Sequence, residues 1–220
     1  MIQAVCFDMD GTLIDTEVLW TEAIQSHLHN HQITLPKADV ERLVYGRSWS
    51  DIYAEIIQQY PDIEESQQEM SSGIQTHYFR LREARDIRIM PSIELLRQLA
   101  DSLPVCIVSG SEAHMVEHGI EIMGIAECLA FFLSGDRYSP GKPSPVCYQM
   151  AAERLGMPPE QCLVFEDSKA GVLSAKAAGM WCVALVQPGR PQQDVSQADQ
   201  IVETLADFDL DEFTQKIAAA

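Results

Sequence analysis

Two aspartates lie two residues apart near the start of the chain, in the stretch VCFDMDGT of residues 5–12. Side chains alternate between the faces of a strand, so Asp8 and Asp10 can face one site. Gly11 lets the backbone turn sharply, or approach a ligand closely, where a Cβ would clash. A surface Asp-Gly turn would explain the last residues alone, but it requires neither the apolar run nor the second acid. The stretch therefore predicts a strand that carries two carboxylates to one point.

Further polar clusters follow apolar runs later in the chain. They are Ser109-Gly110-Ser111, the Lys142 of a Gly-Lys-Pro sequence, and Glu166-Asp167. Each has an ordinary explanation when it is taken alone: a turn, a solvated loop cation, and the N-cap of a helix. Their joint occurrence with the first pair of acids is harder to explain in this way, and it predicts one common site.

Strand-like and helix-like patterns alternate through most of the chain. Strands are expected at about 2–7, 105–108, 162–165 and 181–186, with a further short apolar run at 130–133. Helices are expected at about 93–103, 112–123, 145–155, 171–178 and 207–218. Parallel strands need crossover connections, which are usually helices, so the pattern predicts an α/β fold with a Rossmann-like parallel sheet. Ligands of such sheets bind beyond the carboxyl ends of the strands, where Asp8, Ser109 and Glu166 are expected.

The region from about residue 17 to 88 interrupts this alternation. Its apolar residues recur at helical spacing, as in Leu19, Ala23 and Leu28, and no convincing strand appears. We interpret residues 16–88 as an inserted all-α cap subdomain, and residues 1–15 and 89–220 as the catalytic core. Such a lid would exclude water and gather the substrate while the sheet keeps the reactive groups in place.

Composition restricts the partners. The chain has 220 residues, 46% of them hydrophobic, and 15 Lys and Arg against 33 Asp and Glu, which gives a formal net charge of −18. This charge would repel nucleic acid and anionic membranes, so neither partner is expected. An anionic substrate would need a local cation, for which a divalent metal is the natural choice. The N-terminal sequence and the absence of a long apolar run indicate a cytoplasmic protein, and the six cysteines are interpreted as core residues.

The motifs resemble those of a known family. Phe-Asp-Met-Asp-Gly-Thr, Val-Ser-Gly-Ser, Gly-Lys-Pro and Phe-Glu-Asp-Ser-x-x-Gly occur in that order. In this respect the chain is similar to the haloacid dehalogenase superfamily of phosphohydrolases, over nearly its whole length. Within that superfamily it resembles the branch with a helical cap after the first strand, which includes sugar-phosphate phosphatases and β-phosphoglucomutase.

The resemblance implies roles for the acidic residues. Asp8 would be the nucleophile that forms an aspartyl-phosphate, and Asp10 would protonate the leaving oxygen and later help to activate water. Mg²⁺ would be held by the Asp8 carboxylate, the Asp10 main-chain carbonyl and Asp167, with Glu166 acting through a water. These assignments match what phosphoryl transfer requires, namely an in-line nucleophile, neutralised charge and a proton for the leaving oxygen.

The resemblance also suggests which residues bind the phosphate and the rest of the substrate. Ser109, Gly110, Thr12 and Lys142 are expected at the phosphate, where Lys142 would neutralise charge next to Asp8. The candidate substrate contacts are Trp20, Gly46, Arg47, Trp49 and Ser111. A glycine, a cation and aromatic rings suit the recognition of a polar organic group, although surface packing would explain the same composition.

The run His27, His29 and His31 lies outside these motifs. His27 and His31 would share one face of a helix, so a metal site is conceivable. A solvated helix end explains the run more simply, and we expect that instead. The pair His114 and His118 has the same spacing, and we interpret it in the same way.

Differences within the family favour hydrolysis. Dehalogenases lack the second acid, here Asp10, and phosphonate hydrolases use a cap lysine, for which only Lys37 is present, outside any similar motif. β-Phosphoglucomutases carry a His where this chain has Trp20 and an Arg where it has Trp49. We therefore expect a Mg²⁺-dependent phosphatase of a small phosphorylated metabolite, such as a hexose or polyol phosphate, as a monomer or weak homodimer. The alternatives are a β-phosphoglucomutase and, disfavoured by the intact clusters, a catalytically silent binding or regulatory protein.

Overall fold

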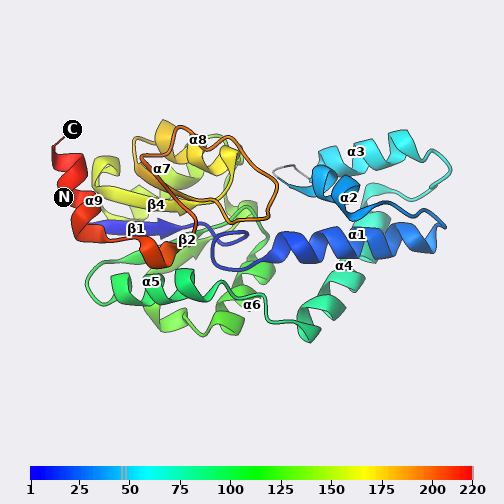
Figure 1. Ribbon diagram of the computed structural model, residues 1–220, viewed down its shortest axis with the longest axis horizontal. Helices are drawn as coiled ribbons and strands as arrows, with labels where there is room; N and C mark the ends of the chain where they lie inside the picture. Colours follow the sequence, from blue (N-terminus) through cyan, green and yellow to red (C-terminus); the bar gives the residue numbers. More distant parts are fainter. Residues whose placement is uncertain (46, 48, 220) are drawn as a thin grey trace. The chain divides into compact units, whose positions relative to one another are not determined.

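The computed structural model describes residues 1–45, 47 and 49–219. The chain divides into two compact units. Unit 1 consists of Met1–Ile14 and Arg88–Ala220, and unit 2 is Asp15–Ile87. Figure 1 labels helices and strands of both units.

The strands of unit 1 form a parallel sheet. They are β1 (Ala4–Phe7), β2 (Val105–Val108), β3 (Phe131–Leu133), β4 (Cys162–Glu166), β5 (Trp181–Leu185) and β6 (Gln200–Val202). Within the described residues they make one six-stranded sheet in the order β3-β2-β1-β4-β5-β6, and every neighbouring pair is parallel. This confirms the predicted sheet. The short edge strand β6 was not predicted, because three residues with an exposed Ile201 leave no periodic signal.

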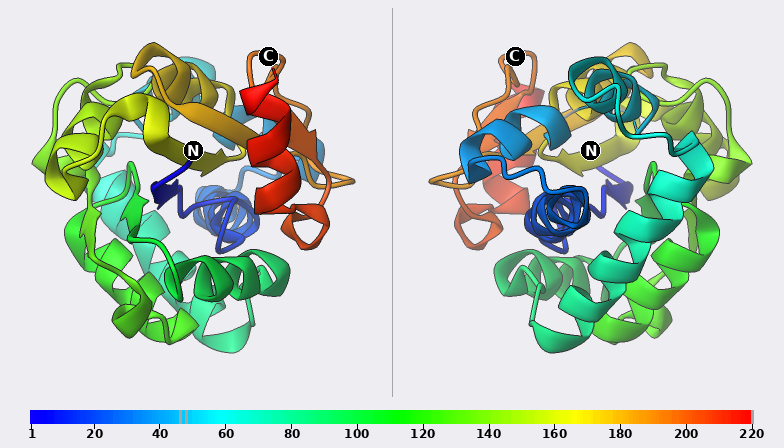
Figure 2. Two further views of the ribbon diagram at one scale, coloured as in Figure 1. Left: turned by 90° about the vertical axis from the view of Figure 1, so that its left-hand side faces the viewer. Right: turned by 90° about the vertical axis from the view of Figure 1, so that its right-hand side faces the viewer.

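Helices cover both faces of this sheet. They are α5 (Met90–Ala100), α6 (Ala113–Met123), α7 (Val146–Leu155), α8 (Lys169–Ala177) and α9 (Leu210–Ala218), with short 3-10 turns at Ala126–Cys128, Gly135–Arg137, Pro159–Gln161 and Leu205–Asp207. Figures 1 and 2 show α5 and α6 on one face and α7 and α8 on the other. Gly124 and Gly156 end α6 and α7 with φ angles of 59° and 69°, in the left-handed conformation typical of helix C-termini.

The central strand β1 is buried on both faces, so its apolar run is continuous. Cys6 belongs to the core cluster that packs against α7 and α8. Phe7 points to the other face and stacks on Phe165 at a centroid distance of 4.6 Å. Alternation then places the next residue, Asp8, on the α7 and α8 side. All six cysteines lie in the described part of the chain as free thiols, and only Cys128 among them is not buried, which agrees with their interpretation as core residues.

Unit 2 is helical. Its helices are α1 (Thr16–Asn30), α2 (Lys37–Val44), α3 (Trp49–Gln59) and α4 (Gln67–Ala84), and no strand occurs in the part of unit 2 that the structure describes. α1 and α4 pack against each other, with the rings of Trp20 and Tyr78 stacked at 4.1 Å. α4 begins with a capping box, in which the side chains of Ser66 and Glu69 each bond the other residue's backbone N–H.

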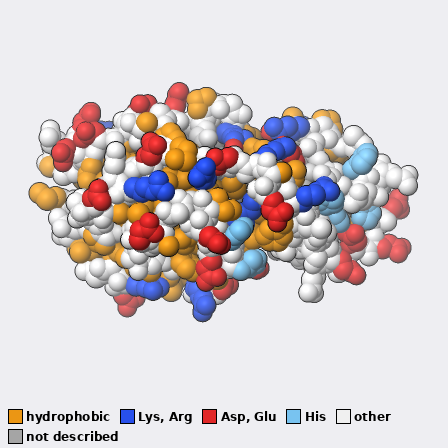
Figure 3. Space-filling view, turned by 90° about the horizontal axis from the view of Figure 1, so that it is seen from below, with side chains coloured by type: hydrophobic (Ala, Val, Ile, Leu, Met, Phe, Trp, Pro, Cys, Tyr) orange, Lys and Arg blue, Asp and Glu red, His pale blue; other side chains and the backbone are white. Residues whose placement is uncertain are grey.

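The surface is mixed in charge. Acidic and basic side chains are intermingled on the face that Figure 3 shows, although acids exceed bases in the whole chain. Among the described residues, no helix has both the length and the apolar character needed to cross a bilayer.

Candidate functional site

Asp8 is the first residue after β1, and its position is determined by the sheet. Its backbone N–H donates to the carbonyl oxygen of Phe165 at 2.9 Å, which continues the pairing of β1 with β4. The chain then turns at Gly11, where φ is +88° and where an added Cβ would overlap the carboxylate of Asp167. Gly11 therefore permits both the turn and the close approach of Asp167.

Lys142 joins two carboxylates inside the protein. Its Nζ donates to Asp8 Oδ1 and to Glu166 Oε1, each at 2.6 Å, and to the carbonyl oxygen of Val108 at 3.0 Å. Burial works to lower the pKa of Lys142, but the charges of Asp8 and Glu166 outweigh it and hold the pKa well above its ordinary value. The side chain, only 11% exposed, is thus a charged ammonium next to Asp8, where sequence reasoning expected it.

Glu166 ends β4 and is fully buried. Its Oε1 accepts hydrogen bonds from Lys142 Nζ at 2.6 Å and from the hydroxyl of Tyr148 at 3.0 Å. Its Oε2 accepts from the backbone N–H groups of Asp167 and Ser168 at 3.1 and 3.2 Å, and from the Ser168 hydroxyl at 3.0 Å. These bonds offset the cost of burying the carboxylate, so Glu166 anchors both Lys142 and the loop after β4.

Asp10 accepts hydrogen bonds from two serine hydroxyls in the loop after β2. Ser109 Oγ and Ser111 Oγ donate to Asp10 Oδ2 at 2.9 and 2.8 Å, and the Ser111 backbone N–H donates to Ser109 Oγ at 3.0 Å. A Cβ added at Gly110 would meet nothing within 4 Å, so the loop backbone lies beside open space there. Ser111 was expected to contact the substrate, whereas in the structure its hydroxyl donates a hydrogen bond to Asp10.

The Thr12 side chain is fully buried and donates from Oγ1 to Asp167 Oδ1 at 3.2 Å. Sequence reasoning placed Thr12 at the phosphate, whereas the structure places its hydroxyl on the Asp167 carboxylate. Because the bond joins the loop after β1 to the loop after β4, it restricts the orientation of Asp167. Thr12 therefore lies at the expected edge of the sheet, but its hydroxyl bonds a carboxylate that was not its expected partner.

The carboxylates at this edge form a donor set for a hard metal ion. Asp8, Glu166 and Asp167 each bring one oxygen within 4.8 Å of the others. Burial raises the pKa of Asp8 well above its ordinary value; Lys142 opposes this, while Glu166 and Asp10 add to it. A divalent cation would relieve the repulsion among these acids, and oxygen-only donors suit Mg²⁺. The residues present therefore fit the expected ion.

Sequence reasoning gave no role to Tyr148 or Gly171. Tyr148 supports Glu166 from α7, and nothing in the sequence around it indicates this contact. Gly171 lies in α8 against the Glu166 carboxyl, which an added Cβ would overlap. The signal for Gly171 was present, because it is the glycine of the Phe-Glu-Asp-Ser-x-x-Gly motif.

The remaining candidates belong to unit 2. Arg47 is exposed and forms an ion pair with Glu55. Trp49 is half-buried, and its indole N–H has no hydrogen-bond partner among the described residues. Gly46 lies outside the described residues. Contact of these residues with a substrate stays a prediction.

Trp20 packs on a ring that also lies beside Arg82, a residue that the sequence analysis did not identify. Its ring stacks on Tyr78, and the guanidinium of Arg82 lies 5.9 Å from the centroid of the same Tyr78 ring. Arg82 is 4% exposed, and no side-chain nitrogen of it has a hydrogen-bond partner within the described residues. Buried polar groups are normally bonded, which makes Arg82 a further candidate for binding an anion. Other arginines lie close to Arg82 in the sequence, so no pattern in the sequence distinguished it from them.

The histidine run differs from expectation. His29 is exposed, but His27 is buried and His31 is half-buried, and both rings contact Glu65. The interpretation of this run as a solvated helix end is therefore wrong for His27. The reason is that His27 lies one turn after Ala23, on the face of α1 that unit 2 buries.

Comparisons with known proteins agree with this geometry. Residues 2–179 match the model of the haloacid dehalogenase-like hydrolases. The chain is 34% identical over 215 residues to a probable pseudouridine-5'-phosphatase of Drosophila melanogaster, covering 94% of this chain and 91% of the relative. It is 26% identical to hexitol phosphatase A of Escherichia coli, covering 90% and 89%. A β-phosphoglucomutase structure from Clostridium difficile matches with a TM-score of 0.81 at 21% identity, covering 100% and 98%, which shows the fold. The chain belongs to the haloacid dehalogenase-like hydrolase family.

Proposed function

We propose that the chain is a Mg²⁺-dependent phosphatase that hydrolyses a small phosphate monoester through an aspartyl-phosphate. The observation that carries this proposal is the buried Lys142, whose ammonium bonds both Asp8 and Glu166 at the carboxyl edge of the sheet. A surface turn or a structural ion pair would not need a second acid, Asp10, held by hydroxyls at the same edge. Family membership supports the same chemistry.

Asp8, Lys142 and Asp10 of unit 1 have separate roles in this mechanism. Asp8 attacks the phosphorus, and Lys142 neutralises charge between the nucleophile and the phosphate. Asp10, oriented by Ser109 and Ser111 in the free protein, gives a proton to the leaving oxygen and later takes one from water. The Ser109 hydroxyl and the Gly110 amide, which lies beside open space, donate hydrogen bonds to the bound phosphate in this proposal.

The carboxylates of Asp8 and Asp167 and the main-chain carbonyl of Asp10 would hold Mg²⁺, with Glu166 acting through a water. When bound, the ion supplies positive charge against the phosphate oxygens. Through the bond from its Oγ1, Thr12 would hold Asp167 in place for binding the ion. Glu166 acts through Lys142, since that ammonium is one of its bonded partners.

Unit 2 supplies substrate selection in this proposal, as the cap of a catalytic core formed by unit 1. The relatives named above are phosphatases of a phosphorylated nucleoside and, by name, of hexitols. We infer a phosphorylated sugar, polyol or nucleoside as the substrate. Trp20, Arg47, Trp49 and the buried Arg82 are the candidate contacts to its polar part.

Phosphate release from a panel of monoesters tests the proposal. With Mg²⁺ present, we expect turnover of a sugar, polyol or nucleoside phosphate, and loss of turnover when EDTA removes the metal. Asp8→Asn should lower turnover about 10⁴-fold or more. Its amide oxygen can still accept the bond from Lys142, so thermal unfolding should stay close to that of the wild type.

Wild-type activity in the Asp8→Asn variant would disprove the mechanism, and full activity in metal-free buffer would disprove the role of Mg²⁺. Conversion of glucose 1-phosphate to the 6-phosphate without phosphate release would identify a mutase instead.

A further inference from the structure

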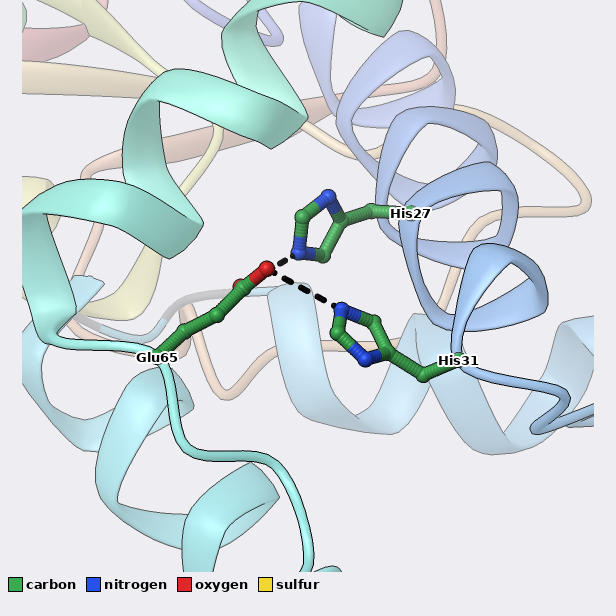
Figure 4. A group of neighbouring side chains, drawn as sticks. All are labelled: His27, His31 and Glu65. Carbon is green, nitrogen blue, oxygen red and sulfur yellow. Dashed lines mark hydrogen bonds and ion pairs between the residues drawn. The ribbon is translucent and has the colours of Figure 1, made fainter.

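Three side chains of unit 2 meet at a point that the phosphatase mechanism does not use. His27 comes from the last turn of α1, His31 is the C-cap residue just after that helix, and Glu65 comes from the loop before α4, as Figure 4 shows. His27 Nε2 lies 2.8 Å from Glu65 Oε2, and His31 Nε2 lies 3.1 Å from Glu65 Oε1. One ligand atom of each residue lies within 4.8 Å of the other two. We propose that this cluster binds a transition-metal dication, and specifically Zn²⁺.

The donor chemistry supports zinc. Residues four apart on a helix share a face, which is how a helix presents two imidazoles to one metal ion. Two imidazole nitrogens and one carboxylate oxygen form a set that Zn²⁺ accepts, with water in the fourth position. Around a tetrahedral zinc such ligands lie about 3.4 Å apart, so small side-chain rotations are enough to close the site. Imidazole is a poor ligand for Mg²⁺, which separates this site from the carboxylates of unit 1.

Glu65 is held in place without a metal. Its carbonyl oxygen accepts a hydrogen bond from the hydroxyl of Tyr53 at 2.9 Å. The next residue, Ser66, is the N-cap of α4, and its backbone N–H donates to Glu69 Oε2 at 2.9 Å. The backbone on both sides of the Glu65 side chain is therefore tied to the helices, and a metal would bind a site that is already largely formed.

His27 is also held in place, by a glycine in the opposite helix. Gly73 lies within α4, where glycine is less favourable than alanine. A Cβ added there would overlap Cε1 of the His27 ring and lie 2.6 Å from its Nδ1. Gly73 thus makes room for the ring in the orientation that turns Nε2 toward Glu65. This observation is independent of the distances within the cluster.

The cluster is open enough for an ion to enter. The side chains of His31 and Glu65 are 30% and 26% exposed, whereas that of His27 is 7% exposed. Figure 3 shows histidine side chains at the surface of this unit. The net negative charge of the chain favours the approach of a cation. When bound, the metal would tie the end of α1 to the start of α4, so it would act as a structural ion of unit 2.

Titration of the whole, untagged protein with Zn²⁺ tests the proposal. A large excess of Mg²⁺ in the buffer competes with Zn²⁺ for the carboxylates of unit 1 and so reduces Zn²⁺ binding there. We expect one equivalent of Zn²⁺ to bind in calorimetry and to raise the melting temperature. Co²⁺ in its place should give the visible absorption typical of four-coordinate cobalt.

Single substitutions locate the site. His31→Ala and Glu65→Gln should each weaken Zn²⁺ binding about 100-fold or more and remove the rise in melting temperature. His29→Ala is the matched control, because His29 is exposed on the same helix and outside the cluster; it should bind as the wild type does. The proposal is overturned if the wild type binds no Zn²⁺ with Mg²⁺ present. It is equally overturned if His31→Ala and Glu65→Gln bind Zn²⁺ as tightly as His29→Ala.

Discussion

The acidic cluster of unit 1 (Asp8, Glu166 and Asp167) and the histidine cluster of unit 2 (His27, His31 and Glu65) each bring three side chains of ligand type together, but by different means. Asp8 and Asp167 meet because two strands that are far apart in the sequence, β1 and β4, are neighbours in the sheet. His27 and His31 meet because they are one helical turn apart, and only Glu65 comes from another segment. The first cluster depends on the whole sheet, whereas the second depends on one pair of packed helices.

The clusters also differ in how their charge is balanced. Unit 1 buries a permanent cation, Lys142, among its carboxylates. In the proposed mechanism, this charge lets the anionic Asp8 face an anionic substrate. Unit 2 places one carboxylate beside two imidazoles, which are neutral when they bind a metal, so the metal ion itself would balance the carboxylate. Three converging ligand side chains therefore do not define a function by themselves. The neighbouring charges and the donor types separate a site for phosphate chemistry from a site that only holds a metal.

The largest effect is expected from removing the buried cation of unit 1. Lys142→Met keeps the length of the side chain but leaves Asp8 and Glu166 without their shared partner. We expect turnover to fall about 10²–10³-fold and the free energy of unfolding to fall by about 3–5 kcal/mol. Steady-state kinetics and chemical denaturation measure the two effects.

The control for this change is Lys169→Met, because Lys169 is a largely exposed lysine of unit 1 that pairs with Asp194. It should change the unfolding free energy little. If both variants unfolded alike, the buried lysine would not be the centre of the acidic cluster.

An intermediate effect is expected from a substitution that weakens Mg²⁺ binding but not Zn²⁺ binding. Thr12→Val preserves shape and removes the hydrogen bond to Asp167. The Mg²⁺ concentration that gives half-maximal activity should rise about 10–100-fold, while Zn²⁺ binding should stay the same. Thr21→Val, a buried threonine of α1 bonded to the Glu17 carbonyl oxygen, is the control. An unchanged Mg²⁺ requirement in Thr12→Val would show that Thr12 does not orient Asp167.

The smallest effect is expected at the helix that supports the histidines. Gly73→Ala adds a methyl group against the His27 ring, so the ring must move. Zn²⁺ affinity should fall about tenfold, with no change in phosphatase turnover at saturating Mg²⁺. Ser72→Ala, at an exposed position of the same helix, should leave both quantities unchanged. A loss of turnover in Gly73→Ala alone would mean that the two clusters are not independent.

Much of the fold and of the acidic site was predictable from sequence. The apolar runs that end at Asp8, Ser109 and Glu166 indicated parallel strands, and the carboxyl ends of such strands share one edge of a sheet. Gly124 and Gly156 indicated where two helices end, because glycine adopts the left-handed conformation at little cost. Sequence therefore determined which residues of unit 1 gather, since backbone periodicity and strand direction are sufficient for that.

Tertiary structure alone decided which partner each side chain takes. Thr12 bonds Asp167, Glu166 bonds Tyr148, and His27 is buried against Gly73, although none of these pairs is close in sequence. The burial of one helical face and the direction of a hydroxyl or an imidazole depend on the element that packs against them. Periodicity along the chain determines which residues share a face of a helix or strand. Only the packing of distant segments determines which residues that face contacts.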